Sequence, residues 1–488
     1  MSPASETSLT GSTQPPAEDK PAGTPITDKI AGEALEAGLR KTVQFPRTGS
    51  LLHALLARPW IDPVCLWGFK RVLPASRAWA AAAATGTSLE GFARQLGLFG
   101  LPPRLRAKLM NTHRLRLVSK AAQTRWAEIA FEGRDGDLAA AELERRRTAQ
   151  SYLANRVRYI SFAKRYHVSP VRYRTPSPEF VIEALAQVLA DPDALFQAPD
   201  PLPTIERSKS VNHGDVIEYW LRFESEGVGD DPADTAYAHI YEPKRSAAGI
   251  PTFFFGHGLA METEMMVDGP RSFLDMARIG MRIVLPDGPG HNRRCKPGLY
   301  GGESFLVEPP ISGIQHFVRA ARESAAMIAW CRAQGPGRIS LGGISLGALS
   351  AQVAASRWRY WPTECRPDAL FLMTSTARIS ALPLESSLGQ MADIDNEVRR
   401  HGWRAEHFQA LEPITDASAE PPLDPASIVL MVGERDDVTP AAGGHALAQQ
   451  WRVPKENLFL RNRGHFSAAI GLGVDPAPYA RMFAILTR

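Results

Sequence analysis

Cysteine is scarce in this chain, with four residues among 488. Cys65, Cys295, Cys331 and Cys365 lie far apart and form no Cys-x-x-Cys pair, so neither a disulfide framework nor a zinc site is predicted. No run of 18 apolar residues occurs, which excludes an ordinary membrane-spanning helix. Residues 1–26 show neither the basic-then-apolar pattern of a secretory signal nor the acid-poor composition of a transit peptide. We therefore expect a soluble cytoplasmic protein.

Net charge is also small, since 56 basic residues face 52 acidic ones and leave +4. A surplus of this size does not predict nucleic acid as the partner. The basic residues are unevenly spread, and residues 101–165 hold 15 Lys and Arg against 6 Asp and Glu. That stretch predicts either the solvated face of amphipathic helices or a peripheral contact with anionic surfaces. Nothing in the pattern specifies an oligomeric state.

The chain divides into three regions that differ in composition and in the spacing of apolar residues. Residues 1–26 are rich in Pro, Ser, Thr and Gly, which predicts a disordered tail. Residues 27–203 carry apolar residues at helical spacing, so we expect a helical accessory region that packs on the remainder and shapes its entrance. Residues 204–488 begin with two alternating segments, 216–225 and 235–243, that are typical of a β-hairpin. Short apolar runs separated by helical segments follow, and they predict a mostly parallel sheet with helices on both faces.

The strongest functional signal is Gly-Ile-Ser-Leu-Gly at 343–347, between an apolar segment and a helical one. A serine on such a strand-to-helix turn projects its hydroxyl above the sheet, and the turn requires small residues two positions to either side. Gly343 and Gly347 meet that requirement. Ser345 is therefore the predicted nucleophile, and an ordinary glycine-rich turn is the alternative.

A second signal is Phe-Phe-Phe-Gly-His-Gly-Leu-Ala at 253–260, where an apolar strand ends in a loop containing Gly258. In serine hydrolases of this architecture, one oxyanion donor is a backbone N–H of this loop, and the other follows the nucleophile. The predicted donors are the N–H groups of Leu259 and Leu346. We interpret His257 as orienting the loop rather than as a base or a metal ligand.

Two further candidates follow later strands. The segment at 432–440, Val-Gly-Glu-Arg-Asp-Asp-Val-Thr-Pro, predicts a carboxylate where a strand ends. Neighbouring side chains of an extended segment point to opposite sides, so only one of Asp436 and Asp437 can face the serine. Asp436 is the preferred candidate. His465 follows the last apolar strand. The chain order Ser345, Asp436, His465 is that of one serine-hydrolase fold and differs from the order in the others.

These residues predict chemistry through a Ser-His-Asp triad. His465 would take the proton of Ser345 as its hydroxyl attacks a carbonyl, while Asp436 would hold the imidazole tautomer. An acyl-enzyme would form and water would release it, with no cofactor and no metal. The segment at 285–294 offers a further acid, Asp287, and a further histidine, His291. Since the triad is complete without them, this segment is interpreted as a structural or pocket-lining loop.

Together the motifs resemble the α/β-hydrolase superfamily over about residues 210–488. Three features are similar to the branch that contains alpha/beta hydrolase domain-containing protein eighteen. They are Tyr300-Gly301, the elbow followed by Trp-Arg-Tyr-Trp-Pro at 358–362, and the Asp-then-Pro and Gly-His segments near the C-terminus. The resemblance implies about eight strands and a cap inserted after the sixth, here residues 377–426. Esterases, lipases, thioesterases and peptidases share this fold, so the fold does not select the substrate.

The preferred hypothesis is a serine hydrolase that cleaves a carboxylic ester of a small or lipid-like molecule. One alternative is an acyltransferase or thioesterase with the same acyl-serine, and another is a non-catalytic scaffold that binds partners through the basic helices. An apolar acyl pocket is suggested by Met261, Met265 and Met266 after the oxyanion loop, together with Phe305, Met391 and Trp403. A cluster of buried methionines is, however, more often plain core.

Overall fold

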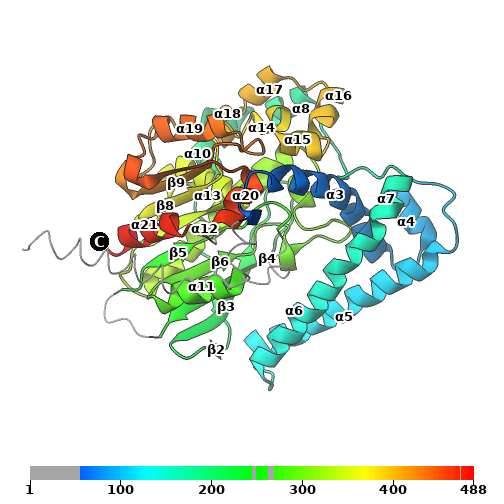
Figure 1. Ribbon diagram of the computed structural model, residues 1–488, viewed down its shortest axis with the longest axis horizontal. Coiled ribbons are helices and arrows are strands. Elements are labelled where there is room, and N and C mark those ends of the chain that lie inside the picture. Colours follow the sequence, from blue (N-terminus) through cyan, green and yellow to red (C-terminus); the bar gives the residue numbers. More distant parts are fainter. Residues whose placement is uncertain (1–54, 245–248, 262–268, 473) are drawn as a thin grey trace, which may run out of the picture.

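The computed structural model describes residues 55–244, 249–261, 269–472 and 474–488 (Figure 1). The predicted tail of residues 1–26 lies outside this part of the chain, as do Met265 and Met266. None of the helices among these residues combines the length and the apolar character of a membrane span. Among the described residues, the four cysteines form no disulfide bond with one another.

One sheet forms the centre of the molecule, with the strand order β1-β3-β4-β6-β5-β7-β8-β9-β10 and with β2 paired to β3. The strands are β1 (Glu206–Arg207), β2 (Val211–Asn212), β3 (Val216–Ser225), β4 (Asp234–Pro243), β5 (Thr252–Phe254), β6 (Arg282–Pro286), β7 (Ile339–Ile344), β8 (Ala369–Met373), β9 (Ile428–Gly433) and β10 (Leu458–Arg461). β3, β4 and β6 pair antiparallel, and the pairings from β6 through β5 to β10 are parallel. The eight main strands, β3 to β10, with β5 lying between β6 and β7, confirm the predicted α/β-hydrolase fold. The two-residue strands β1 and β2 extend one edge of the sheet.

Both faces of the sheet are covered, which is why β7, β8 and β9 are buried at every residue. The covering helices are α11 (Gly269–Arg278), α12 (Ile311–Ala333), α13 (Leu346–Arg357), α19 (Ala441–Gln450) and α21 (Ala477–Leu486). Along β8, Leu370 and Leu372 join the core with α12, α13 and α19, while Phe371 and Met373 join the core with α21. The alternation of side chains along one strand thus divides the interior into two layers.

The segment between β8 and β9 forms the cap. It contains α14 (Leu382–Glu385), α15 (Ser387–Met391), α16 (Ile394–Arg400), α17 (Ala405–Gln409) and α18 (Glu412–Thr415). β8 is the sixth of the eight main strands along the chain. These short helices gather at the top of the molecule in Figure 1, above the ends of the parallel strands.

The region before the sheet is helical. Its helices are α3 (Ile61–Thr85), α4 (Leu89–Leu96), α5 (Leu105–Phe131), α6 (Leu138–Ala154), α7 (Ile160–Arg165), α8 (Pro178–Ala184), α9 (Ala186–Ala190) and α10 (Pro192–Leu195). α3 runs from the hydrolase body to the other helices of this region (Figure 1), and its residues from Ala75 to Ala83 are buried. Its first half contacts α15 of the cap and α20 (His465–Gly471) near the C-terminus.

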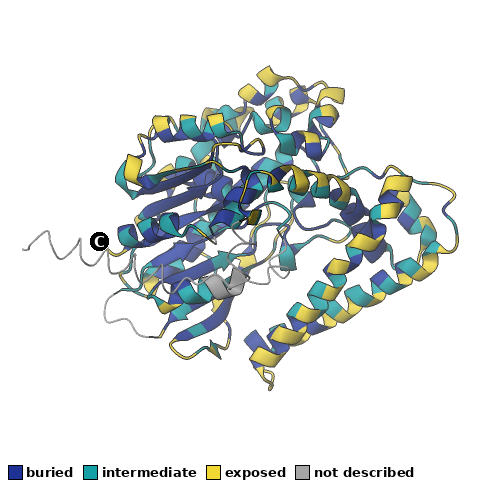
Figure 2. Cartoon of the chain, viewed as in Figure 1, coloured by how far each residue is buried: buried dark blue, intermediate teal, exposed yellow. Residues whose placement is uncertain are grey.

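Most of the basic stretch lies in the hairpin of α5 and α6, whose outer surface is largely exposed (Figure 2). The buried residues of α5 recur at helical spacing, and Trp126 packs edge-on against Trp220 of β3 with ring centroids 5.3 Å apart. One cation of the stretch, Arg145, is buried and paired with Glu142 at 2.7 Å. The hairpin therefore meets the sheet around Trp126, while its basic side lies in solvent.

The carboxylate of Glu303 links the helical region to the hydrolase body. It accepts backbone N–H bonds from Arg172, before α8, at 2.9 Å and from Tyr300 at 3.1 Å, and the Arg77 guanidinium of α3 lies 3.9 Å away. Glu303 is fully buried. Burial raises the pKa of its carboxyl to about 7.

This pKa predicts a pH dependence of stability. The folded state holds the Glu303 proton more tightly than the unfolded chain, so the stabilisation is complete below about pH 4.5 and is lost as pH rises towards 7. A shift of this size corresponds to about 3 kcal/mol. In the wild type, the unfolding free energy should fall by an amount of this order between pH 5 and pH 8. In Glu303→Gln this fall should be absent. Both are measured by urea denaturation.

A matched control is Glu308→Gln, because Glu308 pairs with Arg174 at the surface of the same loop region. This change should leave the pH dependence of the unfolding free energy as in the wild type. Equal pH dependence in Glu303→Gln and wild type would show that Glu303 titrates at the same pH in both folded and unfolded chains.

Candidate active site

Ser345 lies at the turn between β7 and α13, in a backbone conformation that few non-glycine residues adopt. Its φ of 52° and ψ of −122° fall in a sparsely populated region. A Cβ atom at Gly343 would approach the Gly256 carbonyl oxygen to 2.3 Å, and one at Gly347 would approach the same oxygen to 2.2 Å. Small residues on both sides are therefore required for β7 and α13 to pack against the neighbouring loop.

The three predicted triad residues come together in one hydrogen-bonded chain. Nε2 of His465 lies 2.9 Å from Oγ of Ser345, and its Nδ1 lies 2.8 Å from Oδ2 of Asp436. Asp436 follows β9, and His465 is the first residue of α20. This geometry is that of a serine nucleophile, a base and an orienting carboxylate.

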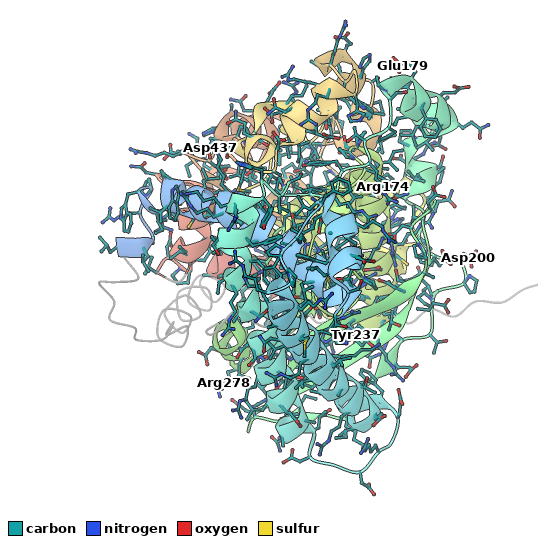
Figure 3. All side chains as sticks on the ribbon, turned by 90° about the vertical axis from the view of Figure 1, so that its right-hand side faces the viewer. Arg174, Glu179, Asp200, Tyr237, Arg278 and Asp437 are labelled. Atoms are coloured by element: carbon teal, nitrogen blue, oxygen red, sulfur yellow. The ribbon has the colours of Figure 1, made fainter. Side chains whose placement is uncertain are left out.

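The Asp436 carboxylate is held by its own loop. Its Oδ1 accepts the N–H groups of Val438 and Thr439, each at 2.9 Å, and its Oδ2 accepts the Thr439 hydroxyl at 2.9 Å. Oδ2 is therefore the oxygen that faces His465. Asp437, by contrast, is exposed (Figure 3) and accepts a hydrogen bond from the Ser387 hydroxyl of the cap at 3.1 Å.

The two predicted oxyanion donors lie beside Ser345. Leu346 is the first residue of α13, so its N–H has no acceptor inside that helix. In the described part of the chain, the N–H of Leu259 also donates to no group. Both residues line a cavity together with Ser345. A Cβ at Gly258 would meet Cβ of Ser345 at 3.4 Å, so Gly258 places this loop directly against the elbow.

His257 joins the oxyanion loop to the loop that follows β6. Its Nε2 accepts the Gly288 N–H at 3.1 Å, so its proton resides on Nδ1, which lies 3.0 Å from the Gly258 carbonyl oxygen. That carbonyl and the Leu259 N–H belong to one planar trans peptide and point in opposite directions. Holding the carbonyl therefore fixes the direction of the Leu259 N–H.

His291 supports the same loop from the other side. It is buried, and burial lowers the pKa of its imidazole well below the ordinary value, which keeps the ring neutral. Its Nδ1 donates to the Pro289 carbonyl at 3.0 Å, and its Nε2 accepts the Ala260 N–H at 3.4 Å. Asp287 instead accepts hydrogen bonds from Asn292 and Arg293 of its own loop.

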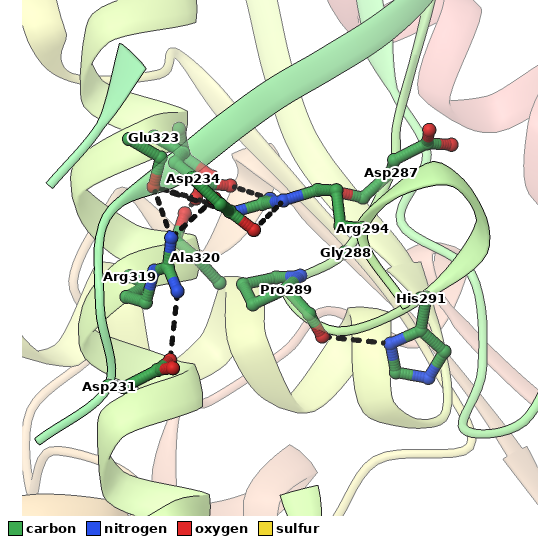
Figure 4. A network of polar contacts seen from close by, with 12 residues as sticks. Asp231, Asp234, Asp287, Gly288, Pro289, His291, Arg294, Arg319, Ala320 and Glu323 are labelled. Carbon is green, nitrogen blue, oxygen red and sulfur yellow. Dashed lines mark hydrogen bonds and ion pairs between the residues drawn. The ribbon is translucent and has the colours of Figure 1, made fainter. Parts of the chain in front are cut away.

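The end of that loop is anchored by a buried ion network (Figure 4). Arg294 contacts Glu323 of α12 at 2.6 Å and Asp234 of β4 at 2.7 Å. Arg319 of α12 contacts Asp231 at 2.8 Å and Asp234 at 2.5 Å. Each guanidinium lies between two carboxylates, which compensates for the cost of burying these charges. The 285–294 segment is thus a structural loop behind the oxyanion donors.

An apolar cavity of about 110 Å³ opens on Ser345 between α12, α13 and the cap. Its apolar lining includes Phe305, Ile314, Leu349, Ile379, Leu388 and Phe408. A second cavity, of about 50 Å³, meets the first at Ser345 and is lined by Phe69 and Leu73 of α3 and by Met391 and His465. Ser345 and the oxyanion loop therefore lie between two apolar spaces.

Of the described residues predicted to form an acyl pocket, some line a cavity and others do not. Phe305 lines the first cavity and Met391 the second, whereas the sulfur of Met261 lies 3.3 Å from the Gly258 nitrogen. Trp403 lines neither cavity. It is buried inside the cap, where its ring lies 4.8 Å from that of Phe408 and its Nε1 donates to the Pro176 carbonyl.

Two residues of the site escaped the sequence analysis. One is Thr439. The pattern Asp436-x-x-Thr439 is a local signal for it, because a Thr hydroxyl can donate a hydrogen bond to an Asp three positions earlier. The second residue is Asp62 of α3, whose carboxylate binds the beginning of α20. Its partners lie more than 400 positions away along the chain, so no local pattern indicates it.

The strand order and the serine elbow define the class of this protein as an α/β-hydrolase fold. Residues 317–373, from α12 through the elbow to β8, match the family alpha/beta hydrolase domain containing 18. This match confirms the predicted resemblance to that branch, over the segment that carries Ser345. No curated protein sequence matches the chain.

Solved structures are also similar to this chain. An acetyl xylan esterase from Paenibacillus sp. R4 has 16% identity and a TM-score of 0.36, over 60% of this chain and 90% of that one. A bacterial heroin esterase has 16% identity and a TM-score of 0.40, over 57% of this chain and 86% of that one. An S-formylglutathione hydrolase from Agrobacterium tumefaciens has 14% identity and a TM-score of 0.34, over 56% and 97%.

Proposed function

We propose that this protein is a serine hydrolase that cleaves a carboxylic ester. The supporting observation is the hydrogen-bonded chain from Asp436 through His465 to Ser345, which ends on a strained elbow. Strained backbone of this kind persists only where the surrounding structure maintains it, and it is concentrated at functional sites. The two apolar spaces that meet at Ser345 leave room for the two halves of an ester.

The proposed reaction has two steps. His465 removes the proton of Ser345 as Oγ attacks the ester carbonyl, and the Leu259 and Leu346 N–H groups stabilise the oxyanion, each contributing roughly 3–4 kcal/mol. The imidazolium then protonates the departing alcohol and leaves an acyl group on Ser345. In the second step, His465 activates water, which hydrolyses the acyl-enzyme and restores the serine. Asp436 stabilises the imidazolium in both steps.

The acyl group of the proposed substrate is apolar. The larger cavity, at about 110 Å³, approaches the roughly 150 Å³ of a cavity that admits benzene. We therefore propose an acyl chain of about six carbons, with the alcohol towards α3. Peripheral contact with anionic surfaces through the basic side of α5 and α6 is a further proposal, and the cytoplasmic location stays a prediction.

A labelling experiment tests the proposed function. A fluorophosphonate probe reacts with a serine only where a base and an oxyanion site activate it, so we expect one labelled serine, identified as Ser345 by peptide mass spectrometry. Labelling combined with release of carboxylic acid from p-nitrophenyl hexanoate would support the hydrolase. An unlabelled, correctly folded chain would favour the scaffold alternative. Labelling without acid release, with acyl transfer to an added alcohol or thiol, would favour the transferase.

The cavity makes a separate prediction about chain length. A Cβ at Gly313 of α12 meets Phe305 at no less than 3.6 Å, so the backbone admits a larger side chain that would fill the cavity. We expect Gly313→Leu to lower kcat/KM for p-nitrophenyl hexanoate by roughly 10–100-fold. The acetate ester should react as with the wild type. Equal losses for both esters would place the acyl chain elsewhere.

A further inference from the structure

α20 begins at the proposed base and lacks a side chain to cap it. Its N-cap residue is Gly464, which has no side chain, and His465 follows as the first helical residue. The first N–H groups of a helix have no acceptor inside the helix and need one from elsewhere. Here that acceptor comes from the other end of the chain.

Asp62 of α3 supplies the missing cap. Its Oδ1 accepts the N–H groups of Phe466 at 2.7 Å and Ser467 at 3.2 Å, and its Oδ2 accepts the Ser467 hydroxyl at 2.5 Å. Oγ of Ser467 in turn accepts the Gly464 N–H at 2.8 Å. Asp62 is therefore connected by hydrogen bonds to both neighbours of His465, directly to Phe466 and through Ser467 to Gly464.

The approach of α3 to α20 depends on glycine at 464. A Cβ built on Gly464 would lie only 2.4–2.6 Å from the carboxyl atoms of Asp62. Seven residues further along α3, about two helical turns, the ring of Phe69 stacks on that of Phe466, with ring centroids 5.3 Å apart and ring planes at 20°. Asp62 itself is buried, so its carboxylate has exchanged water for these partners.

Resting on the proposed function, we infer that Asp62 is a positioning residue for the hydrolase reaction. By capping α20 it maintains the direction of the His465 ring, which must face Ser345 and Asp436 at once. Displacement of a catalytic group by about 1 Å costs roughly 100-fold in rate. The accessory region thereby completes the active site as well as lining one of its cavities.

The test compares Asp62→Ala with Asp62→Asn in the full chain, using p-nitrophenyl hexanoate and the rate of fluorophosphonate labelling. Asp62→Ala should lower kcat and the labelling rate by about 10–100-fold. KM should change by less than about twofold, because neither the acyl cavity nor the oxyanion donors are altered. Asp62→Asn, which keeps an oxygen for the Phe466 and Ser467 N–H groups, should stay within about fivefold of the wild type.

Asp137→Ala is the matched control. Asp137 caps α6 by accepting the Ala139 and Ala140 N–H groups, in the same region but away from Ser345. It should lower the melting temperature while leaving kcat unchanged. Should Asp62→Ala not fold, Ser467→Ala replaces it, since it removes the hydroxyl that joins Asp62 to Gly464 and should lower kcat severalfold.

The outcomes separate the two proposals. A wild-type chain that neither reacts with the probe nor hydrolyses the ester would overturn both. Labelling of the wild type, with equal kcat in folded Asp62→Ala or Ser467→Ala, would overturn the role of Asp62 alone. A loss in Asp62→Ala that Asp62→Asn restores, with Asp137→Ala unaffected, would establish the positioning role.

Discussion

Replacement of Ser345 by alanine is expected to lower kcat by about 10⁴-fold or more while leaving the fold intact. The change removes one hydroxyl, whose partner in the described part of the chain is Nε2 of His465. Oxyanion donors and cavities remain, so a residual rate of roughly 10³–10⁴ over water is expected. The measurements are ester turnover and fluorophosphonate labelling, with circular dichroism to establish folding.

A control serine lies five residues further along α13. The Ser350 hydroxyl donates to the Leu346 carbonyl within its own helix, so Ser350→Ala should retain turnover within about twofold. Wild-type turnover in Ser345→Ala would eliminate the proposed nucleophile.

The second large effect concerns the carboxylate behind the base. Asp436→Asn should lower kcat by about 10⁴-fold. The Val438 and Thr439 N–H groups require an oxygen at the Oδ1 position, so the new amide nitrogen occupies the position that faces His465. Nδ1 of His465 must then accept a hydrogen bond from this amide, and the imidazole proton moves to Nε2, which faces Ser345. A base in this tautomer cannot take the serine proton.

Asp437→Asn is the paired comparison. Asp437 is exposed, and its carboxylate accepts a hydrogen bond from Ser387 rather than from His465, so kcat should stay within about twofold of the wild type. The two variants differ by one position and have the same change in charge. A large loss in Asp437→Asn with normal turnover in Asp436→Asn would mean that a different register operates in solution.

Much of the fold could be predicted because its signals are local. The alternating segments 216–225 and 235–243 correspond to β3 and β4, and the apolar runs correspond to the parallel strands. β1 and β2 could not be predicted, because two residues are too few to show a period.

The candidate site was predictable for a similar reason. Ser345, Asp436 and His465 each follow a strand, and the carboxyl ends of parallel strands lie at one edge of the sheet. For Trp403, the sequence left a pocket and plain core as alternatives, since an apolar residue in a cap has the same sequence signature whether it lines a cavity or fills the core, and the structure places it in the core. Asp62 was missed because an acidic residue in the first turn of a helix is common, and only the tertiary fold brings it to α20.

The link between α3 and α20 also affects when the protein becomes competent during synthesis. Asp62 is synthesised before its partners Phe466 and Ser467, which follow more than 400 residues later. Ser345 and His465 are 120 residues apart, an interval of roughly 6–24 s at about 5–20 residues per second. During that interval a nascent chain holds its nucleophile without its base. Assembly of the Ser345–His465 hydrogen bond must therefore wait until the segment that carries α20 has been synthesised and has folded onto the sheet.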